Sequence, residues 1–257
     1  MKITVLGCAG GVGGPLLRTT CLRVDDDILV DAGTGAADLS LEDMAKIDHV
    51  LLTHAHLDHI CALPLILDSV GAMRTQALTV HALPEVIEAL RRHIFNHHIW
   101  PDFSRIPSAA APYLVFSPLT LGQPLTLGQR RFTALPADHV VPACGYAMTS
   151  PGGQTLVFSG DTGPCPAFLQ AVNQQPQVVA LIIETAFPDA EHQLALAAKH
   201  LCPLQLAGEL QQLQQPADIY VTHLKPGAAD LTMQEVQQAA SAHAPQALSP
   251  GQQFLLD

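Results

Sequence analysis

The order of apolar and polar positions predicts short strands in the first half of the chain and a mixture of strands and helices in the second. Lys2–Leu6 is an apolar run that leads into a glycine-rich loop, and Cys21–Val24 and Ile28–Val30 are typical of the two arms of a hairpin. Further strands are predicted at Asp48–Thr53, Ala77–Ala82, Arg131–Leu135, Ala143–Thr149, Thr155–Ser159, Gln177–Ile183 and Ile219–Thr222. Helices are predicted at His59–Ser69, Pro84–Phe95, Asp189–Lys199, Leu204–Leu213 and Met233–Ala242. Residues Trp100–Pro118 are rich in proline and serine, so we expect a loop there.

The composition is typical of a folded globular protein. Of the 257 residues, 48% are apolar and 14% are charged. Neither a linker nor a charge run separates two folding units, so we expect one α/β domain over residues 1–257, with sheets inside and helices outside. No apolar run reaches the roughly 18 to 20 residues that a membrane span requires, and the start lacks the apolar core of a secretion signal. We therefore predict a cytoplasmic protein that does not bind membranes.

Charge and cysteine content narrow the chemistry further. The net charge is −11, and the sequence shows no cluster of lysine and arginine, which disfavours a large nucleic-acid partner. The six cysteines form no CxxC pair and no zinc-finger spacing. Histidine is the informative residue, because there are thirteen and several lie in tight motifs.

The strongest chemical signal is the run His54-Ala55-His56-Leu57-Asp58-His59, which directly follows a predicted strand. A strand end that leads into a helix presents its side chains to one cleft. Imidazole and carboxylate groups are ligands that zinc favours. A histidine-rich surface turn is the alternative, but this density of ligands after a buried strand favours a metal site.

Three further polar groups follow predicted strands in the second half of the chain. They are Asp138-His139, Asp161 in the segment FSGDTGP, and His223 in the segment VTHLKP. Each one alone is typical of a satisfied polar residue at a strand end. Their shared placement makes them candidates for the same metal site.

In this order the motifs resemble those of the metallo-β-lactamase superfamily, and the resemblance runs from the glycine loop to His223. It implies a four-layer αββα sandwich that holds two divalent metal ions, with zinc expected and manganese or iron as alternatives. The implied ligands are His54, His56 and His139 for one ion, Asp58, His59 and His223 for the other, and Asp161 as a bridge. Asp31, in the segment LVDAGTG, would brace the site without binding metal.

The segment THAHLDHICALPLILDS is similar to the signature of class II cyclic nucleotide phosphodiesterases. The segment HIFNHHIWPDFS and the ETAFP and HLKP motifs resemble the same family. The resemblance implies hydrolysis of a small-molecule substrate, a 3′,5′-cyclic nucleotide such as cAMP or cGMP, to the 5′-monophosphate. Asp58 would orient the nucleophile while binding metal. A homodimer is left open.

The motifs are also similar to those of tRNase Z, a sister family in which a glutamate pairs with a histidine on a later helix. By this likeness His200 is the general acid and Glu184, at the end of an apolar strand, supports its charged form. A histidine that merely caps a helix carbonyl is the alternative. The segment between His139 and Asp161 is too short for the long arm with which the tRNA enzymes hold their substrate, so a cyclic nucleotide is favoured.

Two residues are candidates for substrate binding. Trp100, like Phe95, could stack on a purine or belong to the core. Asn96 could bind a base or phosphate, or cap the helix before it. The glycines after the first strand do not have the G-x-G-x-x-G spacing of a dinucleotide site.

The alternative functions are hydrolysis of a thioester, a lactone or another phosphoester, RNase Z-like cleavage, and binding of metal or nucleotide without turnover.

Overall fold

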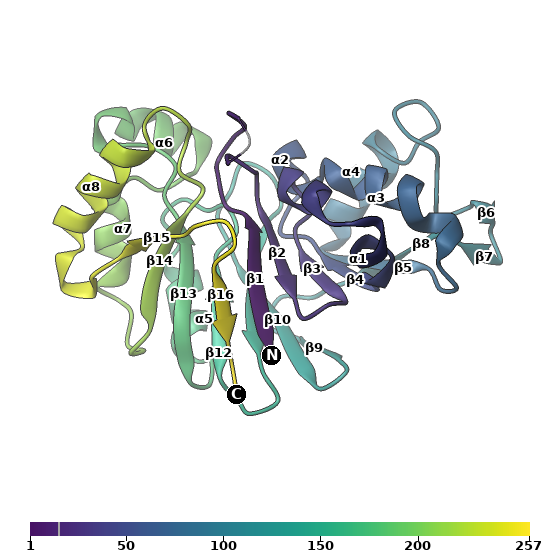
Figure 1. Ribbon diagram of the computed structural model, residues 1–257. Coiled ribbons are helices and arrows are strands. Elements are labelled where there is room, and N and C mark those ends of the chain that lie inside the picture. Colours follow the sequence, from purple (N-terminus) through teal and green to yellow (C-terminus); the bar gives the residue numbers. More distant parts are fainter. Residues whose placement is uncertain (15) are drawn as a thin grey trace.

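Two large β-sheets form the centre of the molecule, and helices cover their outer faces (Figure 1). The structure is a computed structural model that describes residues 1–14 and 16–257. In this part of the chain the first sheet has seven strands, in the order β16-β1-β2-β3-β4-β5-β8. They are β1 (Lys2–Gly7), β2 (Cys21–Val24), β3 (Ile28–Val30), β4 (His49–Leu51), β5 (Leu78–Ala82), β8 (Leu114–Pro118) and β16 (Gln253–Leu255).

The second sheet also has seven strands in the described residues, in the order β15-β14-β13-β12-β11-β10-β9. They are β9 (Pro124–Leu127), β10 (Arg130–Pro136), β11 (Cys144–Thr149), β12 (Thr155–Phe158), β13 (Val178–Glu184), β14 (Asp218–Thr222) and β15 (Gln246–Ala247). A short separate hairpin joins β6 (Pro107–Ser108) and β7 (Ala111–Pro112).

The helices divide between the two outer faces, which gives the predicted αββα order of layers (Figure 1). On the first sheet lie α1 (Leu41–Lys46), α3 (Ala62–Val70) and α4 (Pro84–His93). The single turn α2 (Leu57–Ile60) directly precedes α3. On the second lie α5 (Pro166–Asn173), α6 (His192–Ala198), α7 (Pro203–Leu210) and α8 (Ala229–Ala239). Short 3-10 turns are η1 (Thr34–Asp38), η2 (Gly71–Met73), η3 (Asp189–Glu191) and η4 (Ser241–His243). No helix in residues 1–14 and 16–257 combines the length and apolar character needed to cross a membrane.

The hydrophobic core follows the alternation of side chains along the strands. In β13, Ala180 and Ile182 belong to a cluster that fills the space between the sheets, whereas Leu181 and Ile183 belong to a second cluster. This second cluster packs the outer face of the sheet against α5, α7 and α8. A strand that is buried on both faces reads as a continuous apolar run, which is why β13 is evident in the sequence.

Most predicted elements occur, with some corrections. The hairpin Cys21–Val24 and Ile28–Val30 has the predicted bounds. The expected helix His59–Ser69 is divided between α2 and α3. The prediction of a loop over Trp100–Pro118 is wrong in its last part, because β8 pairs there with β5 at the edge of the first sheet.

Candidate metal centre

The candidate ligands, and Asp31 which supports them, lie beyond the ends of strands that point to the same end of the sandwich. Asp31 follows β3, and His54 lies just beyond β4 in the first sheet. His139, Asp161 and His223 follow β10, β12 and β14 of the second sheet. The site is thus assembled between the two sheets, each of which contributes loops to it.

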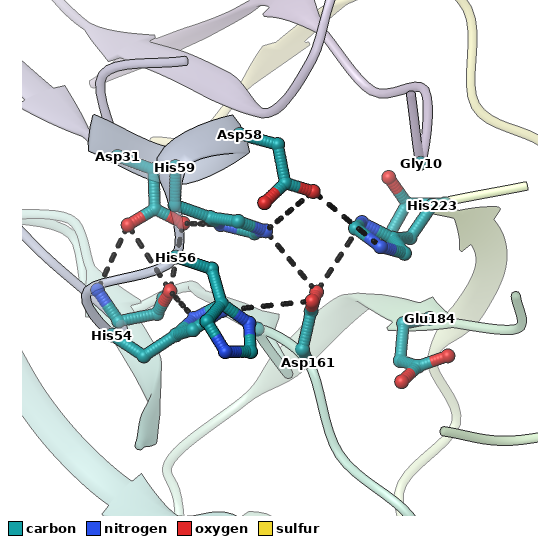
Figure 2. A network of polar contacts seen from close by, with 12 residues as sticks. Gly10, Asp31, His54, His56, Asp58, His59, Asp161, Glu184 and His223 are labelled. Carbon is teal, nitrogen blue, oxygen red and sulfur yellow. Dashed lines mark hydrogen bonds and ion pairs between the residues drawn. The ribbon is translucent and has the colours of Figure 1, made fainter. Parts of the chain in front are cut away.

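The structure brings the seven predicted ligands together in two groups that share one residue. The first group is His54, His56, His139 and Asp161, and the second is Asp58, His59, Asp161 and His223. In each group the candidate ligand atoms lie within 4.8 Å of one another. Figure 2 shows Asp161 between the two groups, with one oxygen 3.6 Å from His54 Nε2 and the other 3.4 Å from His59 Nε2. The Asp161 carboxylate can therefore face both groups at once.

Buried nitrogen atoms without partners show that the site fits metal ions. His54 Nε2, His59 Nε2 and His223 Nδ1 are buried and have no hydrogen-bond partner among the described residues. Such atoms are rare in folded proteins because leaving them unpaired costs free energy. All three point toward Asp161, at the positions where a divalent ion would accept their lone pairs (Figure 2).

A buried hydrogen-bond network orients His59. Its Nδ1 donates to Asp31 Oδ2 over 2.7 Å, which leaves Nε2 to face the metal position. Asp31 also accepts bonds from the backbone N–H of Thr53 at 2.8 Å and from its hydroxyl. Burial alone would lower the pKa of His59, but the charges of Asp161 and Asp31 hold it well above the usual value. The two carboxylates thus favour a positive charge beside His59 Nε2, which either a ring proton or a bound metal ion would supply.

Two further histidines, His54 and His139, are oriented by oxygen atoms that the sequence did not single out. The Thr53 hydroxyl lies 3.0 Å from His54 Nδ1, and His139 Nδ1 donates to the backbone oxygen of Lys199 over 3.0 Å. Thr53 directly precedes the histidine run, so its position was a usable signal. Lys199 acts through its backbone, for which the sequence carries no signal.

His200 and Glu184 form the predicted pair. His200 Nδ1 donates to Glu184 Oε1 over 2.7 Å, and Glu184 also accepts the backbone N–H groups of Thr162 and Leu201. Burial alone would lower the pKa of His200, but the hydrogen bond and charge of Glu184 outweigh it and raise the pKa above its ordinary value. The His200 ring lies 5.0 Å from that of His139 and 5.2 Å from that of His223.

A closed ring of contacts links three of these loops. The Asp138 backbone N–H donates to the Thr162 hydroxyl at 3.0 Å, and the Thr162 N–H donates to Glu184 at 3.0 Å. Glu184 holds His200, and the neighbouring Lys199 returns to Asp138 through an ion pair of 2.6 Å. The loops of His139, Asp161 and His200 are therefore held by one network.

The glycine loop passes against the second group of ligands. A Cβ atom on Gly10 would lie 2.3 Å from the backbone oxygen of His223, so only glycine fits there. A cavity of about 390 Å³ lies beside this loop and is lined by Gly10, Leu57, Asp58 and Cys61, among others.

The two substrate-binding candidates have different surroundings. Trp100 lines an apolar cavity of about 200 Å³ that shares Leu57 and Cys61 with the cavity beside Asp58. Asn96 acts as a cap, since its Nδ2 donates to Arg92 O and its Oδ1 accepts the N–H groups of His98 and Ile99. These contacts are those of the capping alternative, and a role of Asn96 in substrate binding stays a prediction. Phe95 is only 2% exposed and belongs to the core, so it does not stack on a ligand.

A comparison with known protein families agrees with this geometry. The family model of the beta-lactamase superfamily domain matches residues 26–224, which include every candidate ligand. The chain belongs to the metallo-β-lactamase superfamily. Its histidine and aspartate cluster is suited to divalent metal ions.

Curated members of the superfamily include relatives of two kinds. A probable 3′,5′-cyclic-nucleotide phosphodiesterase from Yersinia pestis is 27% identical over 70% of this chain. The match spans 58% of that relative's own length. A ribonuclease Z from Bradyrhizobium diazoefficiens is 28% identical over 60% of this chain and 52% of its own length.

Solved structures of the metallo-β-lactamase fold superpose over nearly the whole chain. Unliganded yeast PDE1 is 19% identical, with a TM-score of 0.82 and 99% of both chains covered. The metallo-beta-lactamase fold protein YhfI from Bacillus subtilis is 21% identical, with a TM-score of 0.78 and the same coverage. At these identities the likeness shows the fold, and the predicted fold is confirmed.

Proposed function

We propose that this chain is a two-metal phosphodiesterase that hydrolyses 3′,5′-cyclic nucleotides to 5′-monophosphates. The observation that carries the proposal is the position of the Glu184–His200 pair. The His200 ring contacts His139 from one ligand group and His223 from the other. A proton donor beside both metal positions suits cleavage of a bond whose leaving group is an alkoxide.

The ligand groups would hold two divalent ions, and zinc is expected because imidazole and carboxylate ligands suit it. The residues proposed to hold them are His54, His56 and His139 in one group, Asp58, His59 and His223 in the other, and Asp161 in both. When bound, the ions would stabilise charge on the phosphate oxygens and lower the pKa of water.

Asp58 has a second proposed role, the orientation of the attacking water. Its side chain is 30% exposed, whereas that of Asp161 is 3% exposed. Asp58 is thus the ligand carboxylate that remains open to the cavity beside the glycine loop. An oxygen of this carboxylate can accept a hydrogen bond from water and direct the water's lone pair at phosphorus.

His200 would donate the proton that the departing 3′ oxygen requires. Its Nδ1 is bonded to Glu184, so Nε2 is the nitrogen that remains for the substrate. The raised pKa favours the protonated form that a general acid must have. Glu184 is a positioning residue in this scheme, because it fixes the ring and supports its charge.

Several features support a small nucleotide over RNA. The segment between His139 and Asp161 contains strands β11 and β12 joined by a short turn, and the net charge is −11. The apolar cavity with Trp100 offers a face for a base, close to Asp58 through their shared neighbour Leu57. The Y. pestis relative also carries the name of a probable cyclic-nucleotide phosphodiesterase.

A substrate screen tests the proposal. Metal-loaded protein is incubated separately with cAMP, cGMP, a precursor tRNA, a thioester and a lactone, and chelator-treated protein serves as the control. We expect turnover of a cyclic nucleotide to the 5′-monophosphate, which chromatography separates from the 3′ isomer. Turnover confined to the tRNA, thioester or lactone would transfer the function to that class. Metal binding without any turnover would favour a binding protein.

A further inference from the structure

Lys225 is a cation that lies against the candidate metal centre without belonging to it. It follows the ligand His223 by two residues in the loop after β14 and is half-buried. Its Nζ donates to the backbone oxygen of Gly10 over 2.9 Å and lies 3.2 Å from His223 Nε2. It also lies 5.9 Å from the centre of the Phe187 ring. These contacts fix the ammonium group between the glycine loop and the second ligand group.

Lys225 differs from Lys46 and Lys199, which both pair with carboxylates. Lys46 pairs with Glu42 and Asp43, and Lys199 pairs with Asp138. No carboxylate among residues 1–14 and 16–257 lies within 4.0 Å of Lys225 Nζ. An ammonium group has three N–H donors, and the Gly10 oxygen accepts one of them. His223 Nε2 accepts none when Nδ1 gives its lone pair to a metal ion, because the ring then carries its proton on Nε2. A half-buried cation with a spare donor and no anionic partner is costly to keep, which points to an anion that the ligand supplies.

Lys225 lies beside both functional histidines. Its Nζ is 3.2 Å from His223 Nε2, and the His223 ring stacks on the His200 ring with their centres 5.2 Å apart. The ammonium group therefore lies next to the second ligand group and near the proposed general acid. The departing oxygen and the phosphate of a phosphodiester would lie in this region if the proposed function is right.

We propose that Lys225 binds a nonbridging oxygen of the substrate phosphate and thereby selects ionised phosphoesters over neutral esters. This inference rests on the proposed function for the identity of the substrate, but not for the existence of the anion site. A phosphodiester has two nonbridging oxygens, so one can lie at the metal positions while the other accepts a bond from Lys225. A lactone or thioester carries no charged oxygen in its ground state, so Lys225 would contribute little to its binding.

Binding of inorganic phosphate to the metal-loaded protein tests the anion site directly. The variants are Lys225→Met, which removes the charge, Lys225→Arg, which keeps it, and Lys46→Met as a matched control on α1. Calorimetry should show phosphate affinity roughly 10- to 100-fold weaker in Lys225→Met, the range for a lost hydrogen bond to a charged group. Lys225→Arg should recover most of the affinity, and Lys46→Met should match the parent protein. Metal content is measured in every sample.

Kinetics then test the selectivity. In Lys225→Met the KM for cyclic nucleotide should rise by a factor similar to the loss of phosphate affinity, while any turnover of a lactone or thioester should stay within about twofold.

Three results would overturn the anion site. The first is that the parent protein does not bind phosphate, and the second is that Lys225→Met binds phosphate as tightly as the parent protein. The third is that both Lys225 variants lose metal, which would show that Lys225 only supports His223. A lactone or thioester rate that falls as far as the cyclic-nucleotide rate would overturn the selectivity. Phosphate binding that depends on Lys225 in a protein without cyclic-nucleotide turnover would uphold the anion site and reject the proposed function instead.

Discussion

The two ends of the sandwich hold the same sheets together by different interactions. At the end that carries Asp161, three buried imidazole nitrogens have no hydrogen-bond partner among the described residues. At the opposite end, Arg130 of β10 reaches across to the turn between β2 and β3. Its guanidinium forms ion pairs of 2.9 Å with Asp25 and 2.6 Å with Asp27, and a second nitrogen bonds Asp27 at 2.7 Å.

This difference separates the part of the structure that binds from the part that folds. The Arg130 end satisfies its charges within the chain, so it stabilises the native state without any ligand. At the Asp161 end three buried imidazole nitrogens have no partner among the described residues, so this end is built to bind a ligand. Substitutions at the first end should change stability alone, and substitutions at the second should change metal binding and catalysis.

The largest effect is expected from Asp161→Asn, because Asp161 serves both ligand groups. Metal content should fall well below the two ions per chain expected for the parent protein. The value of kcat/KM should fall roughly 10⁴-fold or more, since bound metals supply several kcal/mol of transition-state stabilisation and each 1.36 kcal/mol is tenfold. Elemental analysis and initial rates measure the two quantities. Asp218→Asn, at an exposed position where β14 begins, is the control. Full metal content in Asp161→Asn would remove Asp161 from the ligand set.

His200→Ala should keep its metal but lose activity. The rate on cyclic nucleotide should drop roughly 10²- to 10⁴-fold, the range for a positioned acid. The loss should be smaller on a nitrophenyl phosphodiester, whose leaving group is a stable anion and needs no proton. Parallel rate measurements on both substrates make the comparison.

The Glu184→Gln variant sharpens this test, because Glu184 acts only through the imidazole. It should show a weaker version of the same substrate dependence. An equal loss on both substrates in His200→Ala would assign His200 a structural role.

Asp31→Asn should have an intermediate effect, because Asp31 acts through His59. Loss of such an orienting partner typically weakens metal affinity or activity about 10- to 100-fold. Metal competition with a chromophoric chelator measures the affinity. Unchanged affinity would show that the surrounding backbone is enough to hold His59.

At the opposite end, Arg130→Ala should lower stability and spare activity. Its ion pairs are partly buried, with 12% of the Arg130 side chain and 34% of Asp27 exposed. The free energy of unfolding should fall by about 1–2 kcal/mol, between the values for exposed and buried pairs. Urea denaturation measures this change, and kcat/KM at 25 °C should match the parent protein. A loss of activity in the folded variant would contradict the separation of the two ends.

The ion pair between Arg130 and Asp27 predicts a small dependence of stability on pH. The hydrogen bond from Arg130 lowers the pKa of Asp27 below the ordinary value of 3.8. The pair therefore stabilises the fold fully above that value, and its contribution is lost as the pH falls through the lower, folded-state pKa. The stability difference between the parent protein and Arg130→Ala should be constant near neutrality and shrink below about pH 4. A difference that stays constant as the pH falls below about 4 would mean that Arg130 acts through packing.

Sequence reasoning was most successful for patterns of residues that have few possible structural roles. The histidine run and the residues after apolar strands were predicted, and the structure places them together. The purely apolar β13 was also evident. The edge strand β8 was missed because it ends in a serine and a proline, which are typical of a loop, and α5 because it begins within a proline-containing turn.

Contacts made by backbone atoms could not be predicted. The backbone carbonyl oxygen of Lys199 orients His139, and Lys199 has a left-handed φ of 51°. A lysine in the sequence does not predict this conformation. The partnership of Lys225 with Gly10 likewise joins residues from opposite ends of the chain. Such contacts depend on the tertiary fold, so no local pattern encodes them.

The closed ring that runs from Asp138 through Thr162, Glu184 and His200 to Lys199 has a consequence for protein engineering. A designer who wants a different leaving group would begin by replacing the acid. Because the acid's loop also carries the oxygen that aims His139, any backbone shift made for the new acid is transmitted to the coordination sphere. The three loops therefore behave as one transplantable module, and grafting them together onto another αββα scaffold should preserve function better than grafting single residues.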